Sequence, residues 1–391
     1  MKKRIKVKIN SSLIFGLVTI IAFAFICVKN AGLCYRILCK AACASANTVL
    51  TPIYEFKEPV TTVPSTEDTI SPTEETTENN TPAQSDSTTT EVKPTEITEN
   101  DFTATSSDIK KLIEEYEKKS DKDKKDGAII EQTYKDSGVT DKYGNVRVKN
   151  VNDTKINIKN LLSEKADLEI TDKDEPTVLI FHTHTTERYQ ILDRDFYATG
   201  YTSRSMNLKE NMVRVGDEIT DQLEAAGYKV IHDTTIYDSK YNGAYDRSRQ
   251  SIEKYLKEYP SIQIILDIHR DAIQYNNGTK VKPVANIMGK KCAQIMIISG
   301  CQESGNGISG FNDWNYNLIF AVQLQKKLED LFSGITRPLY FCPRKYNMDT
   351  SHCSLLIEIG TDGNTLDEAV FSGRCLGKAL SELMKNYTKE E

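Results

Sequence analysis

Histidine, tryptophan and basic aromatic-rich segments are all scarce in this chain. The 391 residues include 5 His and 1 Trp, and the formal net charge is −6. A nucleic-acid-binding surface typically clusters Lys and Arg on one face, and no segment here combines such a cluster with interleaved aromatic residues. We therefore exclude nucleic acid as a partner. Because histidines are so few, the position of each one in the sequence is informative.

The cysteines show no metal-binding spacing. No two of them form a CxxC pair, which argues against a zinc site made of cysteines. Several lie between residues 27 and 43, and the others are scattered through the C-terminal half. Those five are an odd number and cannot all pair with one another. We expect them to be small buried apolar residues: Cys292, Cys301, Cys342, Cys353 and Cys375.

An apolar segment without charge follows a basic N-terminus. Residues 1–10 carry lysines and an arginine but no acid, and residues 11–28 have no charged side chain. About 17–25 such residues can span a bilayer as a helix, and the basic flank predicts a cytoplasmic N-terminus. We interpret 11–28 as a transmembrane anchor in the cell membrane. A signal peptide cleaved near Ala44–Asn47 is the alternative; both predict export of the remainder.

The next part of the chain is poor in apolar residues. Residues 29–106 comprise a juxtamembrane stretch and then, from Thr61 to Ser106, a segment built mainly of Thr, Glu, Ser and Pro. This composition cannot bury enough apolar surface to offset the entropy of ordering, so we expect a disordered spacer. Residues 107–175 are predicted to form an accessory region, with a charged helix at 108–119 and short strands after it.

From residue 176 to 391 apolar runs alternate with amphipathic helices. The pattern predicts an α/β domain with a mixed, mostly parallel sheet and helices on both faces. The expected strands are 178–181, 228–231, 264–268, 293–299 and 355–359, and the expected helices are 211–226, 248–258, 318–332 and 365–386. Functional sites in such folds form at the carboxyl ends of the strands.

Polar side chains gather at the ends of three of these strands. The first is followed by His182, His184 and Glu187, and the third by His269, Arg270 and Asp271; Glu358 lies near the end of the last. A catalytic zinc site takes three nitrogen or oxygen ligands and leaves one position for water. This set therefore predicts a zinc hydrolase.

We assign roles within this set as follows. His184, Glu187 and His269 are the predicted metal ligands, and Glu358 is the predicted general base. His182 is a predicted catalytic residue, as a ligand, a partner of a ligand or a transition-state donor. It alternates with His184, so the two side chains can point to opposite faces.

Other polar residues have two interpretations each. Arg270 and Asp271 either bind substrate carboxylates and orient His269, or form an ion pair at the strand end. His352 either donates to the substrate or is structural. Residues 241–247 form either a substrate rim or a turn at Asn242-Gly243. Three further residues line the same cleft or a surface loop: His232, Asp233 and Asp238.

Several segments resemble the stage II sporulation protein P family of membrane-anchored peptidoglycan hydrolases. They are VLIFHTHTTERY, GYKVIHDTTIYD, YNGAYDRS, LKEYPSIQIILDIHRDA and LLIEIGTDGNTLDEA. The family is distantly similar to zinc N-acetylmuramoyl-L-alanine amidases, which implies His184 and His269 as ligands and Glu358 as the catalytic glutamate. Those amidases take a glutamate ligand from the start of the next helix, where this chain has Glu210. Metallocarboxypeptidases use the H-x-x-E pattern that matches Glu187, so Glu187 is predicted and Glu210 is the alternative.

The resemblance also implies an activity and a setting. It implies amidase action on peptidoglycan, endopeptidase action on crosslinks, and a complex with stage II sporulation proteins D and M. The expected place is the mother-cell side of the sporulation septum, during engulfment. Two other functions stay open: a metallo-carboxypeptidase or endopeptidase without amidase action, and a non-catalytic scaffold that binds the cell wall.

Overall fold

The computed structural model describes residues 99–302 and 308–389. The predicted anchor and nearly all of the predicted spacer lie outside this part of the chain. Within it, no helix combines the length and apolarity needed to cross a bilayer.

Eight strands form one mixed sheet. They are β2 (Asp141–Tyr143), β3 (Val146–Asn150), β4 (Pro176–Phe181), β6 (Lys229–His232), β7 (Ile264–Asp271), β10 (Ile295–Gly300), β11 (Leu339–Cys342) and β12 (Cys353–Thr361). Their order is β2-β3-β11-β10-β12-β7-β4-β6. Strand β10 is antiparallel to β12 and β2 to β3, while the other neighbours are parallel. The α/β class and the mixed, mostly parallel sheet are confirmed.

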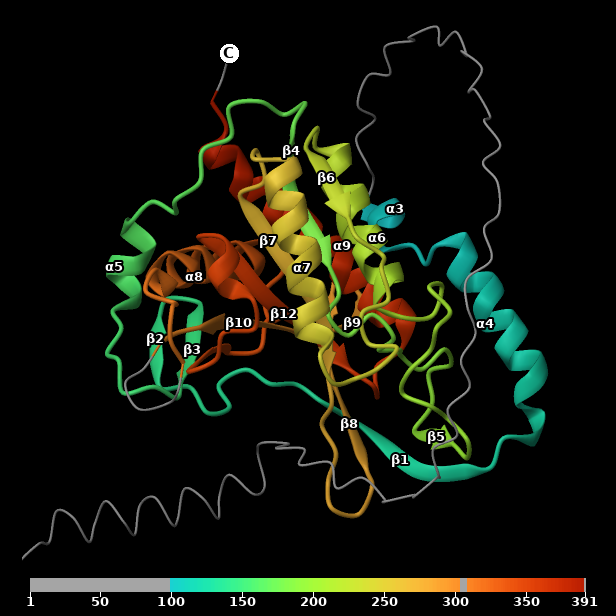
Figure 1. Ribbon diagram of the computed structural model, residues 1–391. Helices are drawn as coiled ribbons and strands as arrows, with labels where there is room; N and C mark the ends of the chain where they lie inside the picture. Colours follow the sequence, from blue (N-terminus) through green and yellow to red (C-terminus); the bar gives the residue numbers. More distant parts are fainter. Residues whose placement is uncertain (1–98, 303–307, 390–391) are drawn as a thin grey trace, which may run out of the picture. The chain divides into compact units, whose positions relative to one another are not determined.

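Helices cover both faces of this sheet, as predicted. They are α6 (Met212–Ala225), α7 (Ala244–Glu258), α8 (Trp314–Leu331) and α9 (Leu366–Met384). Val178 and Ile180 of β4 belong to the core shared with α6, α8 and α9, whereas Leu179 and Phe181 pack with Ile252 of α7. Figure 1 shows α7 and α9 on opposite sides of the sheet. Successive side chains of β4 therefore point to opposite faces of the sheet and belong to two separate hydrophobic clusters.

The helix starts follow from local sequence. Thr365 and Glu368 form a reciprocal capping box at α9, and the Asn211 side chain accepts from the backbone N–H of Val213 at α6. These caps satisfy N–H groups that the first turn leaves without an intrahelical partner. Helix α7 begins at Ala244, earlier than predicted, after Gly243 turns the chain with a φ of 78°.

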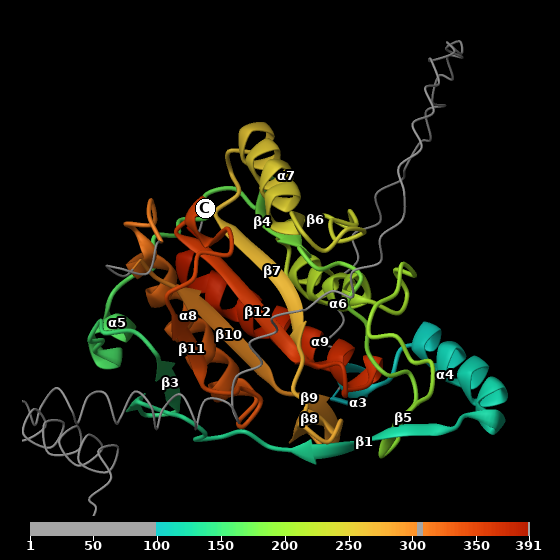
Figure 2. The same ribbon diagram turned by 60° about the horizontal axis from the view of Figure 1, so that its bottom comes forward.

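A second, four-stranded sheet has the order β5-β1-β8-β9. Its strands are β1 (Lys125–Gln132), β5 (Phe196–Ala198), β8 (Lys280–Ile287) and β9 (Lys290–Ala293). Figure 2 shows β8 and β9 near the end of β7, and the hydroxyl of Thr361, the last residue of β12, donates to the carbonyl of Val281. The small sheet thus lies beside the carboxyl end of β12. Of its strands, the sequence predicted only β1.

The segment 107–175 is integrated into the same compact unit as the rest of the described chain. It contains α4 (Ser107–Lys119) and α5 (Ile158–Ser163), while α3 (Glu99–Thr103) precedes it. Its strand β3 pairs in parallel with β11 of the eight-stranded sheet. The predicted accessory region therefore completes one edge of the main sheet.

Candidate metal centre

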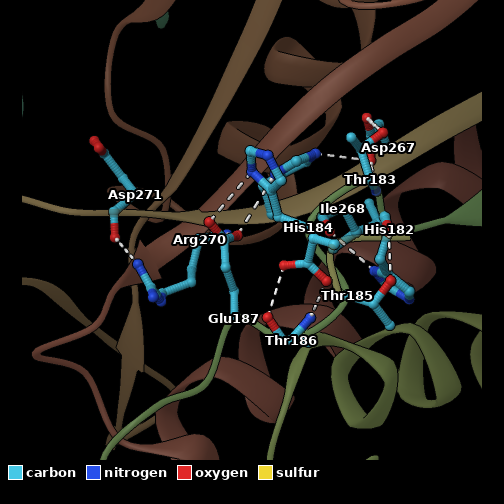
Figure 3. A network of polar contacts seen from close by, with 12 residues as sticks. His182, Thr183, His184, Thr185, Thr186, Glu187, Asp267, Ile268, Arg270 and Asp271 are labelled. Atoms are coloured by element: carbon cyan, nitrogen blue, oxygen red, sulfur yellow. Dashed lines mark hydrogen bonds and ion pairs between the residues drawn. The ribbon is translucent and has the colours of Figure 1, made fainter. Parts of the chain in front are cut away.

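Three predicted ligands converge at the carboxyl ends of β4 and β7. The distance from Nδ1 of His184 to Oε1 of Glu187 is 3.6 Å, and that from Nδ1 of His269 to Oε2 of Glu187 is 3.5 Å. All three donor atoms lie within 4.8 Å of one another. Because β4 and β7 are parallel neighbours, residues that follow β4 meet residues that end β7 (Figure 3).

Neighbouring groups hold these side chains in place. Oε2 of Glu187 accepts the backbone N–H of Arg270 at 3.2 Å. Burial raises the pKa of Glu187, but the Arg270 guanidinium and hydrogen bonds from the two histidines outweigh it and hold that pKa well below its usual range. The carboxylate is therefore ionised, as a metal ligand must be.

Asp267 supports His269 from the same face of β7. Its carboxylate accepts the backbone N–H of Thr183 at 2.8 Å and the Thr183 hydroxyl at 2.7 Å. Oδ1 also lies 2.7 Å from Nε2 of His269, but that nitrogen has no hydrogen bond of good geometry. A carboxylate behind a metal-ligating histidine is a common arrangement that fixes the ring.

The donor set fits zinc. Two imidazoles and one carboxylate form a three-ligand set that leaves a fourth position for water. A second group of acids, Glu131, Asp193 and Glu368, differs from it because a lysine lies among them. Nζ of Lys282 is 3.3, 2.6 and 3.0 Å from their carboxylate oxygens. Nζ of Lys291 also lies 2.5 Å from Glu131 and 3.2 Å from Asp193. Two ammonium groups already pair with these acids, so we assign no metal to the cluster.

Glu358 lies next to the three ligands. It pairs in register with His269 across β12 and β7, and register partners on parallel neighbours project from the same face. Its Oε2 atom is buried without a hydrogen-bond partner among the described residues. Burial and the charge of Asp271 raise the pKa of Glu358 to about 8. The carboxyl group is thus placed to exchange protons at the metal centre.

The sequence profile of the family "Stage II sporulation protein P (SpoIIP)" matches residues 57–381. The chain belongs to this family. A relative from Bacillus subtilis (strain 168), "Stage II sporulation protein P", is 30% identical over 227 residues, which cover 54% of this chain and 52% of the relative. The chain thus spans about half the length of this curated relative. The resemblance inferred from the sequence is confirmed.

Solved structures with a partial likeness are bacterial amidases. The CwlD amidase from Clostridioides difficile, in complex with the GerS lipoprotein, aligns with a TM-score of 0.34 and 12% identity, over 54% of this chain and 98% of that one. The N-acetylmuramoyl-L-alanine amidase AmiC2 of Nostoc punctiforme aligns with a TM-score of 0.31 and 13% identity, over 56% of this chain and 98% of that one.

In this SpoIIP-family protein, His182 lies away from the metal centre, which corrects its predicted catalytic role. Its ring is fully buried. Nδ1 lies 2.9 Å from the carbonyl of Ile268, and Nε2 lies 2.9 Å from Nε2 of His232. Figure 3 shows His182 and Glu187 in different parts of the network. The alternation of β4 continues past its end, so His182 shares the α6 face with Ile180.

The packing around His182 predicts a glycine requirement in α6. A Cβ atom on Gly216 would lie 2.3 Å from Nε2 of His232 and 2.7 Å from Nε2 of His182. Although alanine favours a helix, we expect Gly216→Ala to destabilise the protein by about 1–3 kcal/mol, because two buried rings must move apart. Urea denaturation would measure this, with Glu224→Ala on the exposed side of α6 as the control. Equal stability of both variants would contradict it.

The structure also corrects the predicted substrate contacts of Arg270 and His352. The Arg270 guanidinium is buried and donates to the carbonyls of Arg188 and Ser203. His352 precedes β12 at the start of the strand, where Cys353 pairs with Ile264. That is the opposite end of the sheet from His269. There, Nδ1 of His352 lies 2.5 Å from Asp167.

Asp271 and Glu210 are also engaged by arginines. Asp271 accepts from Arg337 at 2.9 Å, and its charge is close enough to affect Glu358. This ion pair agrees with the structural interpretation of Asp271, and its predicted contact with substrate stays a prediction. Glu210 forms an ion pair with Arg188 at 3.0 Å and is not part of the triad. Glu187 is therefore the glutamate at the centre.

Aromatic side chains form one wall of the centre. The Tyr241 ring stacks on His184 with centroids 4.9 Å apart, and the Tyr245 ring lies parallel to that of His269 at 6.4 Å. Tyr346, from the loop after β11, stacks on Tyr245 at 5.4 Å. The rim predicted at 241–247 is thus adjacent to the ligands. The sequence did not predict Tyr346, because its loop is remote from every ligand along the chain.

The structure also shows where the cysteines, His232 and Asp238 lie. All five cysteines of the C-terminal half are buried, as expected. His232 lies 3.1 Å from Asp217 on the α6 side. Asp238, by contrast, is buried next to the metal centre and accepts the backbone N–H of Thr186 at 3.0 Å.

Proposed function

We propose that this protein is a zinc-dependent N-acetylmuramoyl-L-alanine amidase that hydrolyses peptidoglycan during sporulation. The observation that carries the proposal is the convergence of His184, Glu187 and His269 beside Glu358 at one edge of the sheet. Membership of the SpoIIP family supports the sporulation setting.

The residues divide the chemistry as follows. His184, Glu187 and His269 would hold the ion. When bound, zinc polarises a carbonyl group and lowers the pKa of its water to about 7. Glu358 takes a proton from the water as its oxygen adds to the amide carbonyl carbon. Glu358 then gives this proton to the amide nitrogen as the C–N bond breaks. The products are the lactyl carboxylate and the free amine of L-alanine.

The aromatic wall suits a polymeric substrate. Tyr241 is 61% exposed although its ring stacks on a predicted ligand. An exposed aromatic face next to the reacting groups offers apolar contact to a sugar ring or a peptide stem. The proposed setting includes an anchor at residues 11–28, a catalytic domain outside the cytoplasm on the mother-cell side of the septum, and a complex with stage II sporulation proteins D and M.

Digestion of purified sacculi tests the proposal. The full chain, in detergent and loaded with zinc, should release intact stem peptides with a free L-alanine amine and leave unsubstituted glycan, as mass spectrometry would detect. Shortened or uncrosslinked peptides that stay attached to glycan would indicate an endopeptidase instead. Wall binding without any released product, equal in the presence and absence of metal, would indicate a scaffold.

A further inference from the structure

We propose that Arg204 is a further catalytic residue, which stabilises the negative charge that forms on the carbonyl oxygen during amide hydrolysis. The inference rests on the proposed function. Arg204 lies in the segment between β5 and α6, and Nη2 is 3.9 Å from Oε1 of Glu187. Its guanidinium carbon lies 5.1 Å from the centroid of the Tyr241 ring, which stacks on His184. The Arg204 guanidinium therefore lies close to Glu187 and to the tyrosine ring that stacks on His184.

The guanidinium is fixed from behind by a buried carboxylate. Nη1 of Arg204 bonds to Asp238, whose side chain is fully buried, and also donates to the hydroxyl of Thr186 at 3.1 Å. Asp238 in turn accepts the hydroxyl of Thr186 at 2.7 Å. One side of the guanidinium is therefore held in a closed network, and Nη2 is the nitrogen nearer to Glu187. Donors that are held in place before the reaction stabilise charge most effectively.

The backbone is held as well. Arg204 forms an isolated bridge with Glu187, and the N–H of Ser205 donates to the carbonyl of Thr186 at 2.7 Å. The N–H of Arg188 donates to the carbonyl of Ser203 at 3.1 Å. The segment that carries the guanidinium is thus hydrogen-bonded to the segment that carries a predicted ligand, which keeps the two side chains in register.

Neighbouring arginines are already committed. Arg270 is buried and bonds to backbone carbonyls, and Arg188 pairs with Glu210. Arg337 pairs with Asp271, and its side chain is only 11% exposed. The Arg204 side chain is 37% exposed. Of these four arginines, Arg204 is the one with a substantial surface open to solvent.

The reaction step requires such a group. When the water oxygen bonds to the carbonyl carbon, the π electron pair moves to the carbonyl oxygen and leaves a tetrahedral oxyanion, while the water proton goes to Glu358. The oxyanion then re-forms the C=O bond as the C–N bond breaks and the amine takes that proton. A guanidinium beside the oxyanion lowers the energy of this state more than that of the neutral amide.

Kinetics on sacculi would test this assignment. We expect Arg204→Ala to lower kcat by ~10²–10³-fold, with KM and bound zinc within about twofold of the wild type. Arg204→Lys should recover only part of the rate, because lysine lacks the planar fork. Added guanidinium at millimolar concentration should partly restore Arg204→Ala. The matched control is Arg194→Ala, which removes an arginine paired with Asp123 at 2.8 Å.

A binding measurement makes the test independent of turnover. Calorimetry with a phosphinate analogue of the lactyl–L-alanine amide, whose tetrahedral oxygens mimic the oxyanion, should give ~100-fold weaker binding to zinc-loaded Arg204→Ala than to the wild type. Equal binding would overturn the assignment. A higher KM at unchanged kcat would instead indicate ground-state binding of a substrate carboxylate, and lost zinc would indicate that Arg204 only positions Glu187. An inactive wild type that also fails to bind the phosphinate would contradict the proposed function and the Arg204 assignment with it. An active wild type with equal phosphinate binding by Arg204→Ala would overturn the assignment alone.

Discussion

Glu358→Gln is expected to lower peptidoglycan hydrolysis by ~10²–10⁴-fold and to leave bound zinc unchanged. Glutamine has nearly the same shape but cannot take a proton from water. The carboxyl group is a register partner of His269 and has an unpartnered buried oxygen, which places it to accept that proton. Release of stem peptides from sacculi and zinc analysis of the same preparation would measure both quantities.

Glu224→Gln provides a control for Glu358→Gln, since Glu224 is exposed in the last turn of α6, which leads into the start of β6 and not to its carboxyl end. It should hydrolyse sacculi at the wild-type rate. A Glu358→Gln protein that also retained the wild-type rate would show that another group carries the proton. A variant that lost both zinc and activity would make Glu358 part of the metal shell.

Replacing a predicted ligand should have a different signature. We expect His184→Ala to lose zinc, with affinity reduced by more than ~100-fold, because changes at residues that merely orient ligands already cost 10–100-fold. Hydrolysis should fall with metal content and recover little at saturating zinc. Inductively coupled plasma mass spectrometry of dialysed protein would give the zinc-to-protein ratio.

A pair of glutamate variants sharpens this prediction. Glu187→Gln should lose zinc as His184→Ala does, whereas Glu210→Gln should keep it, because Glu210 is engaged by Arg188 and Asn207. The reverse result would place the third ligand at the start of α6 and would refute the triad. This comparison tests the two alternatives that the sequence left open.

The sequence predicted the regular part of the site well. His184, Glu187, His269 and Glu358 follow or end strands that are short, apolar and bounded by polar residues, and the ends of parallel neighbours meet by geometry. The sequence indicated that His182 and His184 can point to opposite faces, but it left the role of His182 open. Its partners, the carbonyl of Ile268 and the ring of His232, come from elements far away along the chain.

Closeness along the chain was a poor guide to closeness in space for His352. His352 is six residues from Glu358, but six residues of strand span about 20 Å, so the two occupy opposite ends of β12. Arg204 and Tyr346 were missed for the converse reason. Both lie in irregular segments that long-range packing brings to the centre. Such segments have no helix or strand periodicity from which their position in the fold could be predicted.

The convergence of ligands from β4 and β7 has a consequence for when the protein becomes competent. Between His184 and β7, which carries His269, lie β5, α6, β6 and α7, so an unfolded chain offers only isolated donors and no assembled site. The proposed zinc ion would bind the native state preferentially and stabilise it by mass action, by about 2.7 kcal/mol at a free zinc concentration 100 times the Kd. On the proposed function, the protein would become able to hydrolyse its substrate only when β4 and β7 pair, and the bound ion would in turn stabilise the sheet that holds its ligands.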